Sequence, residues 1–286
     1  MSNVFRAIIV LMTMSMCMLT PARAQDDLLV AKRSVDNGGY KFWVYTPEDY
    51  FYTQEYTPLV LFLHGASLCG NDLHQVLRYG PINAVMKGRT IPAVIVAPQN
   101  PGGPWNPKKL NDILDWMEHH YAYDHDRVYV LGMSLGGYGT LDFVGTYPER
   151  VAAAMALCGG CTLKDVSRLG ELPLWIIHGT ADVAVNVKES QQVVSQMKTK
   201  HHDSRLRYDW LSGADHGVLA RLFYTQKTYD WLFSHSRLDS TLSVNRQISI
   251  GMNDLQQAYS DIVSRAEKLE VIMDMKADNN KNNIKK

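Results

Sequence analysis

The feature that most constrains the fold is a short apolar run, residues 128–131, that leads into Gly132-Met133-Ser134-Leu135-Gly136 and then into a helical stretch over residues 137–147. A serine between a strand and a helix lies on a sharp turn with unfavourable backbone angles. Glycines on both sides of it let the chain approach itself closely there. The pattern therefore predicts a strand, a tight turn that presents the Ser134 hydroxyl, and a helix that begins directly after it.

Other apolar, β-rich runs alternate with amphipathic stretches along the chain. Residues 59–63, 93–97, 151–157, 174–177 and 205–211 predict further strands, and residues 40–45 predict an antiparallel strand near the first edge of the sheet. Leu110, Ile113, Leu114 and Met117 recur at helical spacing and define one face that packs on a sheet. We therefore expect an α/β fold, a mostly parallel sheet with helices on both faces.

The equal numbers of acidic and basic residues indicate what kind of molecule the protein binds. Lysine and arginine together number 29, as do aspartate and glutamate, in a chain of 286 residues. With no basic excess, we expect neither nucleic acid nor an anionic membrane as a partner, but a neutral or weakly charged small molecule.

The N-terminus has the pattern of an export signal. Arg6 precedes an uncharged run over residues 7–20, and small residues lead up to Ala24. We expect a signal peptide over residues 1–24, cleavage after Ala24, and a periplasmic or secreted mature protein without an integral membrane segment. A lipoprotein anchored through Cys17 is the minority alternative, because Met16 is larger than the residue that such processing prefers.

The composition changes near residue 237, where Ser, Asn, Gln and Lys become common. We expect a catalytic domain over residues 25–236 and a C-terminal helical extension over residues 237–286 with a disordered tail. Apolar residues alternate at spacings of four and three along the extension, at Leu255, Tyr259, Ile262, Ala266, Leu269 and Met273. The short seam favours a helix that lies back on its own domain, and a homodimer contact is the alternative.

The mature chain would keep three cysteines, Cys69, Cys158 and Cys161, which is an odd number for an oxidising compartment. Cys158 and Cys161 form a CxxC pattern without the helical context of a redox motif, so we expect a local structural role or a disulfide. No second pair of cysteines or histidines has the spacing of a zinc site. The sequence therefore predicts no metal and no cofactor.

A serine hydroxyl needs a base within hydrogen-bond reach and an acid that orients the base. His216 follows the last predicted strand, in the loop at residues 212–217, and Asp182 lies in the turn after residues 174–177. Both positions are at the carboxyl ends of strands, in the chain order serine, acid, histidine. We therefore expect Ser134, Asp182 and His216 to form a triad. Asp215 is the rival acid, and it ranks lower because it is the immediate neighbour of the histidine.

The loop at residues 64–67 follows the strand at residues 59–63 and is the expected place of an oxyanion hole. We assign its donors to the backbone N–H groups of Ala66 and Leu135, each worth on the order of 3 kcal/mol in the transition state. His64 is expected to hold this loop, and His178 to brace the acid loop. Trp105, in the turn-rich stretch at residues 98–107, has two equal interpretations: it forms a wall of the substrate pocket, or it packs the loop.

Taken together, residues 59–67, 93–105, 128–137, 176–182 and 214–217 resemble those of small exported esterases with the α/β-hydrolase fold. These are the relatives of feruloyl and acetylxylan esterases, polyhydroxybutyrate depolymerases and dienelactone hydrolases. The resemblance spans residues 40–233. It implies Ser134 as nucleophile, His216 as base, Asp182 as acid, and the Ala66 and Leu135 amides as oxyanion hole. The chain differs from dienelactone hydrolases in having serine where they have cysteine.

The expected function is that of a serine carboxylesterase acting on a small-molecule or oligosaccharide ester, with acetyl or feruloyl esters of plant-type polysaccharides as the implied substrates. A serine peptidase of the prolyl oligopeptidase type shares the fold and triad, but the residues before Tyr40 cannot supply the large gating domain of such peptidases. A non-catalytic binding protein of the same fold is the third alternative. The complete set of triad residues favours the esterase.

Overall fold

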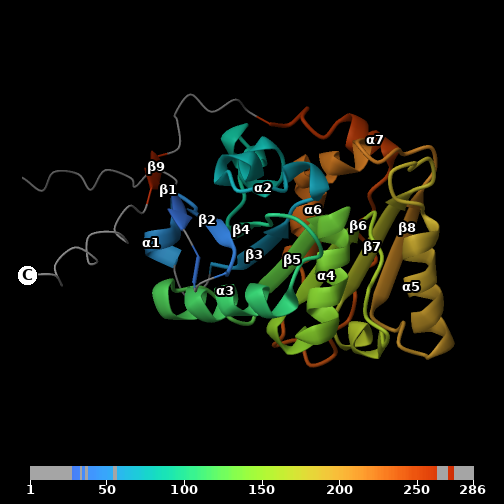
Figure 1. Ribbon diagram of the computed structural model, residues 1–286. Helices are drawn as coiled ribbons and strands as arrows, with labels where there is room; N and C mark the ends of the chain where they lie inside the picture. Colours follow the sequence, from blue (N-terminus) through green and yellow to red (C-terminus); the bar gives the residue numbers. More distant parts are fainter. Residues whose placement is uncertain (1–27, 33, 36–37, 54–56, 263–269, 274–286) are drawn as a thin grey trace, which may run out of the picture.

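The computed structural model describes residues 28–32, 34–35, 38–53, 57–262 and 270–273. The predicted signal peptide, Cys17 and the tail beyond residue 273 lie outside these residues. The described chain is built on one sheet with the strand order β8-β7-β6-β5-β3-β4-β2-β1-β9 (Figure 1).

Every strand predicted from the sequence is present. The bounds are β2 Lys41–Thr46, β3 Leu59–Leu63, β4 Val94–Gln99, β5 Val128–Met133, β6 Ala153–Leu157, β7 Leu174–Gly179 and β8 Leu206–Leu211. From β4 through β3 to β8 all neighbours pair in parallel, and β2 is antiparallel to β4 as expected. All residues of β3 to β7 are buried, because helices cover both faces of a parallel sheet.

Helices pack on the two faces of the sheet in separate layers (Figure 1). One layer contains α3 Pro107–His120, α4 Leu135–Thr146 and α5 Lys188–Thr199. The other contains α2 Pro81–Met86, α6 Gln226–Phe233 and α7 Met252–Gln256, while the short α1 Tyr50–Thr53 precedes β3. The predicted face of α3 is confirmed, since the four residues of that face are the buried ones of the helix. The α/β architecture, with helices on both faces of one sheet, is therefore the one that the sequence predicts.

The C-terminal segment differs from its prediction. The expected helix through residues 255–273 is wrong at its far end: α7 ends at Gln256, and Glu270–Met273 forms strand β9, parallel to β1 Leu28–Lys32. The strand β1 already pairs with β2 on one side, so its other edge carries backbone N–H and C=O groups that a further strand can satisfy. Backbone pairing at this edge is a tertiary contact that side-chain spacing does not encode.

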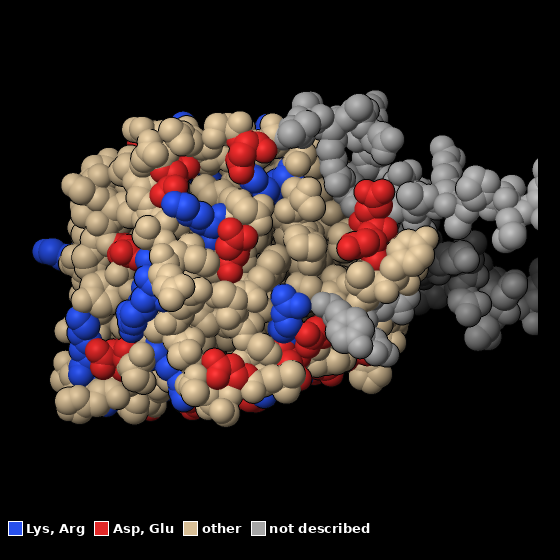
Figure 2. Space-filling view, turned by 180° about the vertical axis from the view of Figure 1, so that it is seen from behind, with Lys and Arg blue, Asp and Glu red and all other residues tan. Residues whose placement is uncertain are grey.

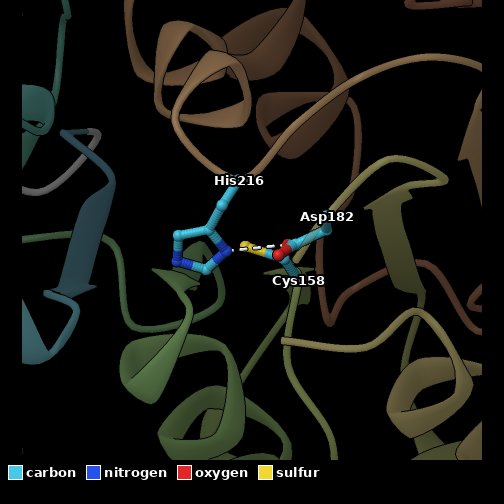
Figure 3. Close-up of side chains that lie close together, drawn as sticks. All are labelled: Cys158, Asp182 and His216. Atoms are coloured by element: carbon cyan, nitrogen blue, oxygen red, sulfur yellow. Dashed lines mark hydrogen bonds and ion pairs between the residues drawn. The ribbon is translucent and has the colours of Figure 1, made fainter. Parts of the chain in front are cut away.

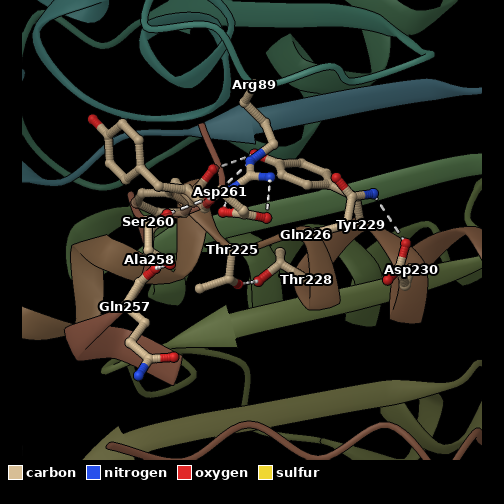
Figure 4. Close-up of polar contacts among 12 residues, drawn as sticks. Arg89, Thr225, Gln226, Thr228, Tyr229, Asp230, Gln257, Ala258, Ser260 and Asp261 are labelled. Carbon is tan, nitrogen blue, oxygen red and sulfur yellow. Dashed lines mark hydrogen bonds and ion pairs between the residues drawn. The ribbon is translucent and has the colours of Figure 1, made fainter. Parts of the chain in front are cut away.

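The described part of the extension packs on its own domain, as the sequence favours. Leu255 and Ala258 are buried in the core, and α7 contacts the 3-10 segment Val218–Tyr224. Arg89, which is 5% exposed, binds the carboxylate of Asp261 and donates to the carbonyl oxygens of Tyr224 and Ala258 (Figure 4). The guanidinium thus ties the extension to the segment that follows the predicted base. A homodimer contact through this region stays a prediction.

The surface agrees with the balanced composition. Acidic and basic side chains are interspersed on the face seen in Figure 2, without a large area of one sign. No helix within the described ranges is long and apolar enough to cross a membrane.

Candidate active site

Ser134 lies on the sharp turn that the sequence predicts. It joins β5 to α4 with φ 59° and ψ −121°, a left-handed backbone conformation that costs a non-glycine residue on the order of 1–3 kcal/mol. A Cβ on Gly136 would lie 1.8 Å from the carbonyl oxygen of Leu63, and one on Gly132 would lie 2.2 Å from that of Gly136. The close approach predicted for both glycines is confirmed. The surrounding backbone therefore holds the strained turn in place.

The side chains of Asp182 and His216 come together at the carboxyl end of the sheet (Figure 3). The Nδ1 atom of His216 lies 2.7 Å from Oδ2 of Asp182, although 34 residues separate them in the chain. The other carboxylate oxygen accepts the N–H groups of Ala184 and Val185, both at 2.9 Å. The predicted rival, Asp215, is exposed and accepts the Val218 N–H instead.

The ionisation of Asp182 sets the tautomer of the histidine. Burial opposes the charged carboxylate, but hydrogen bonds from Val185 and His216 outweigh it and hold the pKa of Asp182 below its ordinary value. An ionised carboxylate can only accept, so Nδ1 of His216 carries the proton. The Nε2 atom is then left with its lone pair, which is the state that a general base requires.

A second histidine contacts the same carboxylate. The Nε2 atom of His178 lies 3.3 Å from Oδ2 of Asp182 and 3.0 Å from the carbonyl oxygen of Val185. Its Nδ1 atom lies 2.7 Å from Oγ of Ser190 on α5. The ring is fully buried, and burial lowers its pKa. These contacts lie within the acid loop and its neighbour α5, as expected for a side chain that braces this loop.

Cys158 is the residue of this site that sequence reasoning missed. It directly follows β6, has φ 39°, and is fully buried. Its sulfur lies within 4.8 Å of ligand atoms of both Asp182 and His216 (Figure 3). Burial raises the pKa of the thiol, while the nearby Ser134 N–H acts in the opposite direction. The side chains of Asp182 and His216 and the backbone N–H of Ser134 therefore lie near one buried sulfur, whose raised pKa favours the thiol form.

The position of Cys158 at the carboxyl end of a predicted strand is a signal for a site residue, whereas its CxxC spacing indicates a local structural role or a disulfide with Cys161. No disulfide joins the two: Cys69, Cys158 and Cys161 are all free thiols. Cys161 instead lies beside Asp142 of α4, with its sulfur 3.4 Å from Oδ1. The disulfide alternative is thus wrong for this structure, because the two side chains face different partners.

The loop after β3 passes next to the serine. A Cβ on Gly65 would lie 3.2 Å from Cβ of Ser134, and the Gly65 N–H donates to the hydroxyl of Tyr79 at 2.8 Å. Ala66 is exposed and begins a short 3-10 turn, Ala66–Leu68. Leu135 is the first residue of α4, where backbone N–H groups have no acceptor within the helix. Both amides predicted as oxyanion donors thus belong to segments that flank Ser134, and Tyr79 is a loop anchor that the sequence did not reveal.

His64 and Trp105 hold this loop from the inside. Nε2 of His64 accepts the Asn100 N–H at 3.0 Å, and its Nδ1 lies 2.8 Å from the Gly65 carbonyl oxygen. Desolvation lowers the pKa of His64 to about 4, although the bond to Gly65 acts against it. Trp105 is 3% exposed and packs edge-on against His64 and Tyr40. Of its two interpretations, the structure supports loop packing, since a buried indole leaves no surface for a pocket wall.

Comparisons with known proteins bear on the fold of this chain. The model of the dienelactone hydrolase family matches residues 106–230. A thermostable esterase of known structure is 28% identical with a TM-score of 0.60, over 74% of this chain and 64% of that one. The chain has the α/β-hydrolase fold.

Two further proteins to which the chain is similar are esterases. A feruloyl esterase module from Clostridium thermocellum, solved with sinapinate, is 18% identical over 70% of this chain and 86% of that one, with a TM-score of 0.51, a likeness that concerns the fold alone. A bifunctional acetylxylan esterase/xylanase from Neocallimastix patriciarum is 28% identical over 94 residues, or 32% of this chain. This chain spans only 14% of that relative and 64% of the thermostable esterase. The chain is thus similar to hydrolases of the esterase type.

Proposed function

We propose that this protein is a serine carboxylesterase with Ser134 as nucleophile, His216 as general base and Asp182 as the acid that orients it. The observation that carries the proposal is the 2.7 Å contact between Nδ1 of His216 and the buried, ionised carboxylate of Asp182. It lies at the same edge of the sheet as the strained turn at Ser134. A histidine held by a carboxylate beside a serine on such a turn is the arrangement that activates a hydroxyl.

In the proposed reaction, Oγ of Ser134 attacks the ester carbonyl carbon while Nε2 of His216 takes the hydroxyl proton. The tetrahedral intermediate collapses, the carbon–oxygen bond to the alcohol breaks, and His216 returns the proton to the departing alcohol. A water then attacks the acyl-enzyme, with His216 again as base, and free Ser134 and the carboxylic acid are released.

The developing oxyanion would be bound by the N–H groups of Ala66 and Leu135. Leu135 begins a helix of 12 residues, so the positive end of its dipole also favours the negative charge. Gly65 is a poor substitute, because its N–H already donates to Tyr79. Donors of this kind act strongly because they are oriented before the reaction begins.

The names of the relatives support the substrate class. One is an acetylxylan esterase/xylanase, and several solved structures of the same fold are feruloyl esterases. We infer acetyl or feruloyl esters on a plant-type polysaccharide or oligosaccharide as the substrates of this protein. Trp105 is left out of the proposed pocket because of its burial.

The serine variant provides the first test. Purified protein should hydrolyse a short-chain nitrophenyl ester and be labelled by a fluorophosphonate, and Ser134→Ala should lose both properties. Loss of a serine nucleophile costs on the order of 10⁶-fold in kcat. Ser195→Ala, on the exposed face of α5, is the matched control. Activity of Ser134→Ala close to that of the control would refute the assignment.

Variants of two aspartates, Asp182 and Asp215, test which carboxylate orients His216. Asp182→Asn should lower kcat by on the order of 10⁴-fold, because an amide stabilises the wrong tautomer of the histidine. Asp215→Asn, on an exposed side chain in the base loop, should retain activity. Reversed effects would move the acid to Asp215. Cleavage of peptide amides with no cleavage of esters would favour the peptidase alternative, and the absence of turnover with either would favour a binding protein.

We also propose export, with residues 1–24 removed and residues 25–236 forming the catalytic domain. The support is the charge and small-residue pattern before Ala24. Mass spectrometry of the protein recovered outside the cytoplasm should show a chain that begins at Gln25. An intact N-terminus there would refute the cleavage site, and acylation at Cys17 would establish the lipoprotein alternative.

A further inference from the structure

The buried thiol of Cys158 lies at the site, and the proposed esterase reaction does not use it. Its backbone N–H donates to the Ile177 carbonyl oxygen at 2.9 Å, which fixes the residue between β6 and β7. In Figure 3 the sulfur lies beside the Asp182 carboxylate, near the ring of His216. One thiol, one carboxylate and one imidazole thus converge from three different loops.

These three donors lie at separations that one metal ion can span. The sulfur, a carboxylate oxygen and a ring nitrogen lie within 4.8 Å of one another. Ligands of a tetrahedral ion with bonds of about 2.0–2.3 Å are about 3.6 Å apart. For such an ion to bind, the sulfur would have to move about 1 Å closer to the other two donors. The distance between Nδ1 of His216 and Oδ2 of Asp182, now 2.7 Å, would have to increase by about 1 Å. Side-chain rotation of the quarter-exposed His216 can supply such a movement.

The ligand types of Cys158, Asp182 and His216 indicate which metal ions the site would bind. Thiolate and imidazole suit Zn²⁺ and its heavier congener Cd²⁺, whereas Mg²⁺ and Ca²⁺ prefer sets of oxygen ligands. A divalent ion bound by the Cys158 thiolate and the Asp182 carboxylate would be electrically neutral as a unit. Neutrality matters because both of these side chains are fully buried, where an unbalanced charge is costly.

We propose that Cys158, Asp182 and His216 form an inhibitory site for a soft divalent cation such as Zn²⁺ or Cd²⁺. On binding, bonds form from the ion to Sγ, Oδ2 and Nδ1. The S–H bond of Cys158 breaks and its proton leaves to solvent, while His216 loses its proton at Nδ1 and gains one at Nε2. No oxidant or reductant is needed.

Inhibition follows from the same bonds and rests on the proposed function. The ion replaces the hydrogen bond that orients His216, and the proton on Nε2 removes the lone pair that would accept the proton of Ser134. The sequence predicts no metal here because the ligands belong to three separate loops, so no short spacing marks the site. The fourth position of a tetrahedral ion would be open to solvent on the exposed side of His216.

Binding is tested without any enzyme assay. Chelator-treated protein is titrated with CdCl₂, and the near-ultraviolet charge-transfer absorption of a cadmium–thiolate bond is recorded. We expect saturation at one equivalent in the wild type, in Ser134→Ala, and in the Cys69→Ser/Cys161→Ser control, in which Cys158 is the only thiol left among the described residues. Cys158→Ala should lack the band. A band that persists in Cys158→Ala, or one that disappears in the control, would overturn the proposal.

His216→Gln tests the geometry in a second variant, in case Cys158→Ala does not fold. It retains the thiol but removes one ligand. Loss of a group that merely supports a ligand weakens metal binding about 10–100-fold, so loss of the ligand itself should weaken cadmium binding at least that much. Unchanged affinity in His216→Gln would contradict the three-ligand site.

Inhibition is measured separately on the nitrophenyl ester. Zn²⁺ and Cd²⁺ should abolish wild-type activity at one equivalent and be reversed by chelator, and Mg²⁺ should have no effect. The remaining activity of Cys158→Ala should be insensitive to both soft ions. Cadmium binding without ester hydrolysis in metal-free protein would refute the esterase but retain the site, and hydrolysis without binding would do the opposite.

Discussion

The buried imidazole of His64 makes the stability of this fold depend on pH between about 4 and 6.5. Its pKa is lowered to about 4 from an ordinary value of 6.5, first because the ring is fully buried. Protonation of Nε2 would also break the 3.0 Å hydrogen bond that this atom now accepts from the Asn100 N–H, because two N–H donors would then point at each other. Between these two pKa values the unfolded chain binds a proton that the folded chain does not.

The magnitude follows from linkage. Because the folded pKa is the lower one, the contribution is fully present above pH 6.5, is lost as the pH falls, and changes no further below pH 4. The whole window is worth about 3 kcal/mol, and the part between pH 7 and pH 5 about 2 kcal/mol. His178 and His235, whose pKa values burial also lowers, add to the same trend. The contribution of His64 alone is therefore measured by comparing wild type with a variant of this one residue.

His64→Gln isolates this contribution. Glutamine can still accept from Asn100 but does not titrate, so the variant should be less stable at pH 7 yet lose about 2 kcal/mol less than wild type on going to pH 5. Urea unfolding followed by circular dichroism at both pH values gives the four free energies required. His125→Gln, on an exposed side chain, is the control and should follow wild type. Equal pH dependence in wild type and His64→Gln would refute the reasoning.

Three further predictions concern packing. Gly136→Ala should yield little folded protein, because its Cβ would overlap backbone at 1.8 Å, whereas Gly251→Ala meets no atom within 4 Å and should melt close to wild type. Trp105→Ala should lower the free energy of unfolding by about 3–5 kcal/mol in urea titrations, and a loss below about 1 kcal/mol would contradict its placement in the core. Arg89→Met should speed limited proteolysis within residues 250–262 more than Asp261→Asn does. The arginine variant leaves two buried carbonyl oxygens unpaired as well as the Asp261 carboxylate, whereas Asp261→Asn removes only the charge of that carboxylate. Equal proteolysis rates in the two variants would contradict this ranking.

Much of the fold could be predicted because its signals are local. Strands β3 to β7 are short, largely apolar runs between turn residues, and the buried face of α3 repeats at helical spacing. The turn at Ser134 could be predicted because the backbone packs so closely there that Gly132 and Gly136 have no room for a side chain. The sequence shows this requirement directly as two glycines. The expected pairing of Asp182 with His216 follows from strand order, since parallel strands bring their carboxyl ends to one edge.

Other features depended on contacts between segments far apart in the chain. Trp105 had two equal interpretations, and only the packing of Gly139, His64 and Tyr40 around it decided for burial. The last part of the C-terminal extension pairs as a strand with β1, because an open sheet edge offers backbone groups whatever the side-chain spacing.

The sequence by itself determined the α/β architecture, the turn at Ser134 and the order of the triad candidates, because each depends on periodicity or on backbone demands within a few residues. The tertiary structure alone decided which thiol lies beside Asp182 and His216. Cys158 reaches Asp182 and His216 through the alignment of neighbouring strands and the left-handed backbone at its own position. Such a convergence of three loops is a property of the packed sheet, and no pattern along the chain records it.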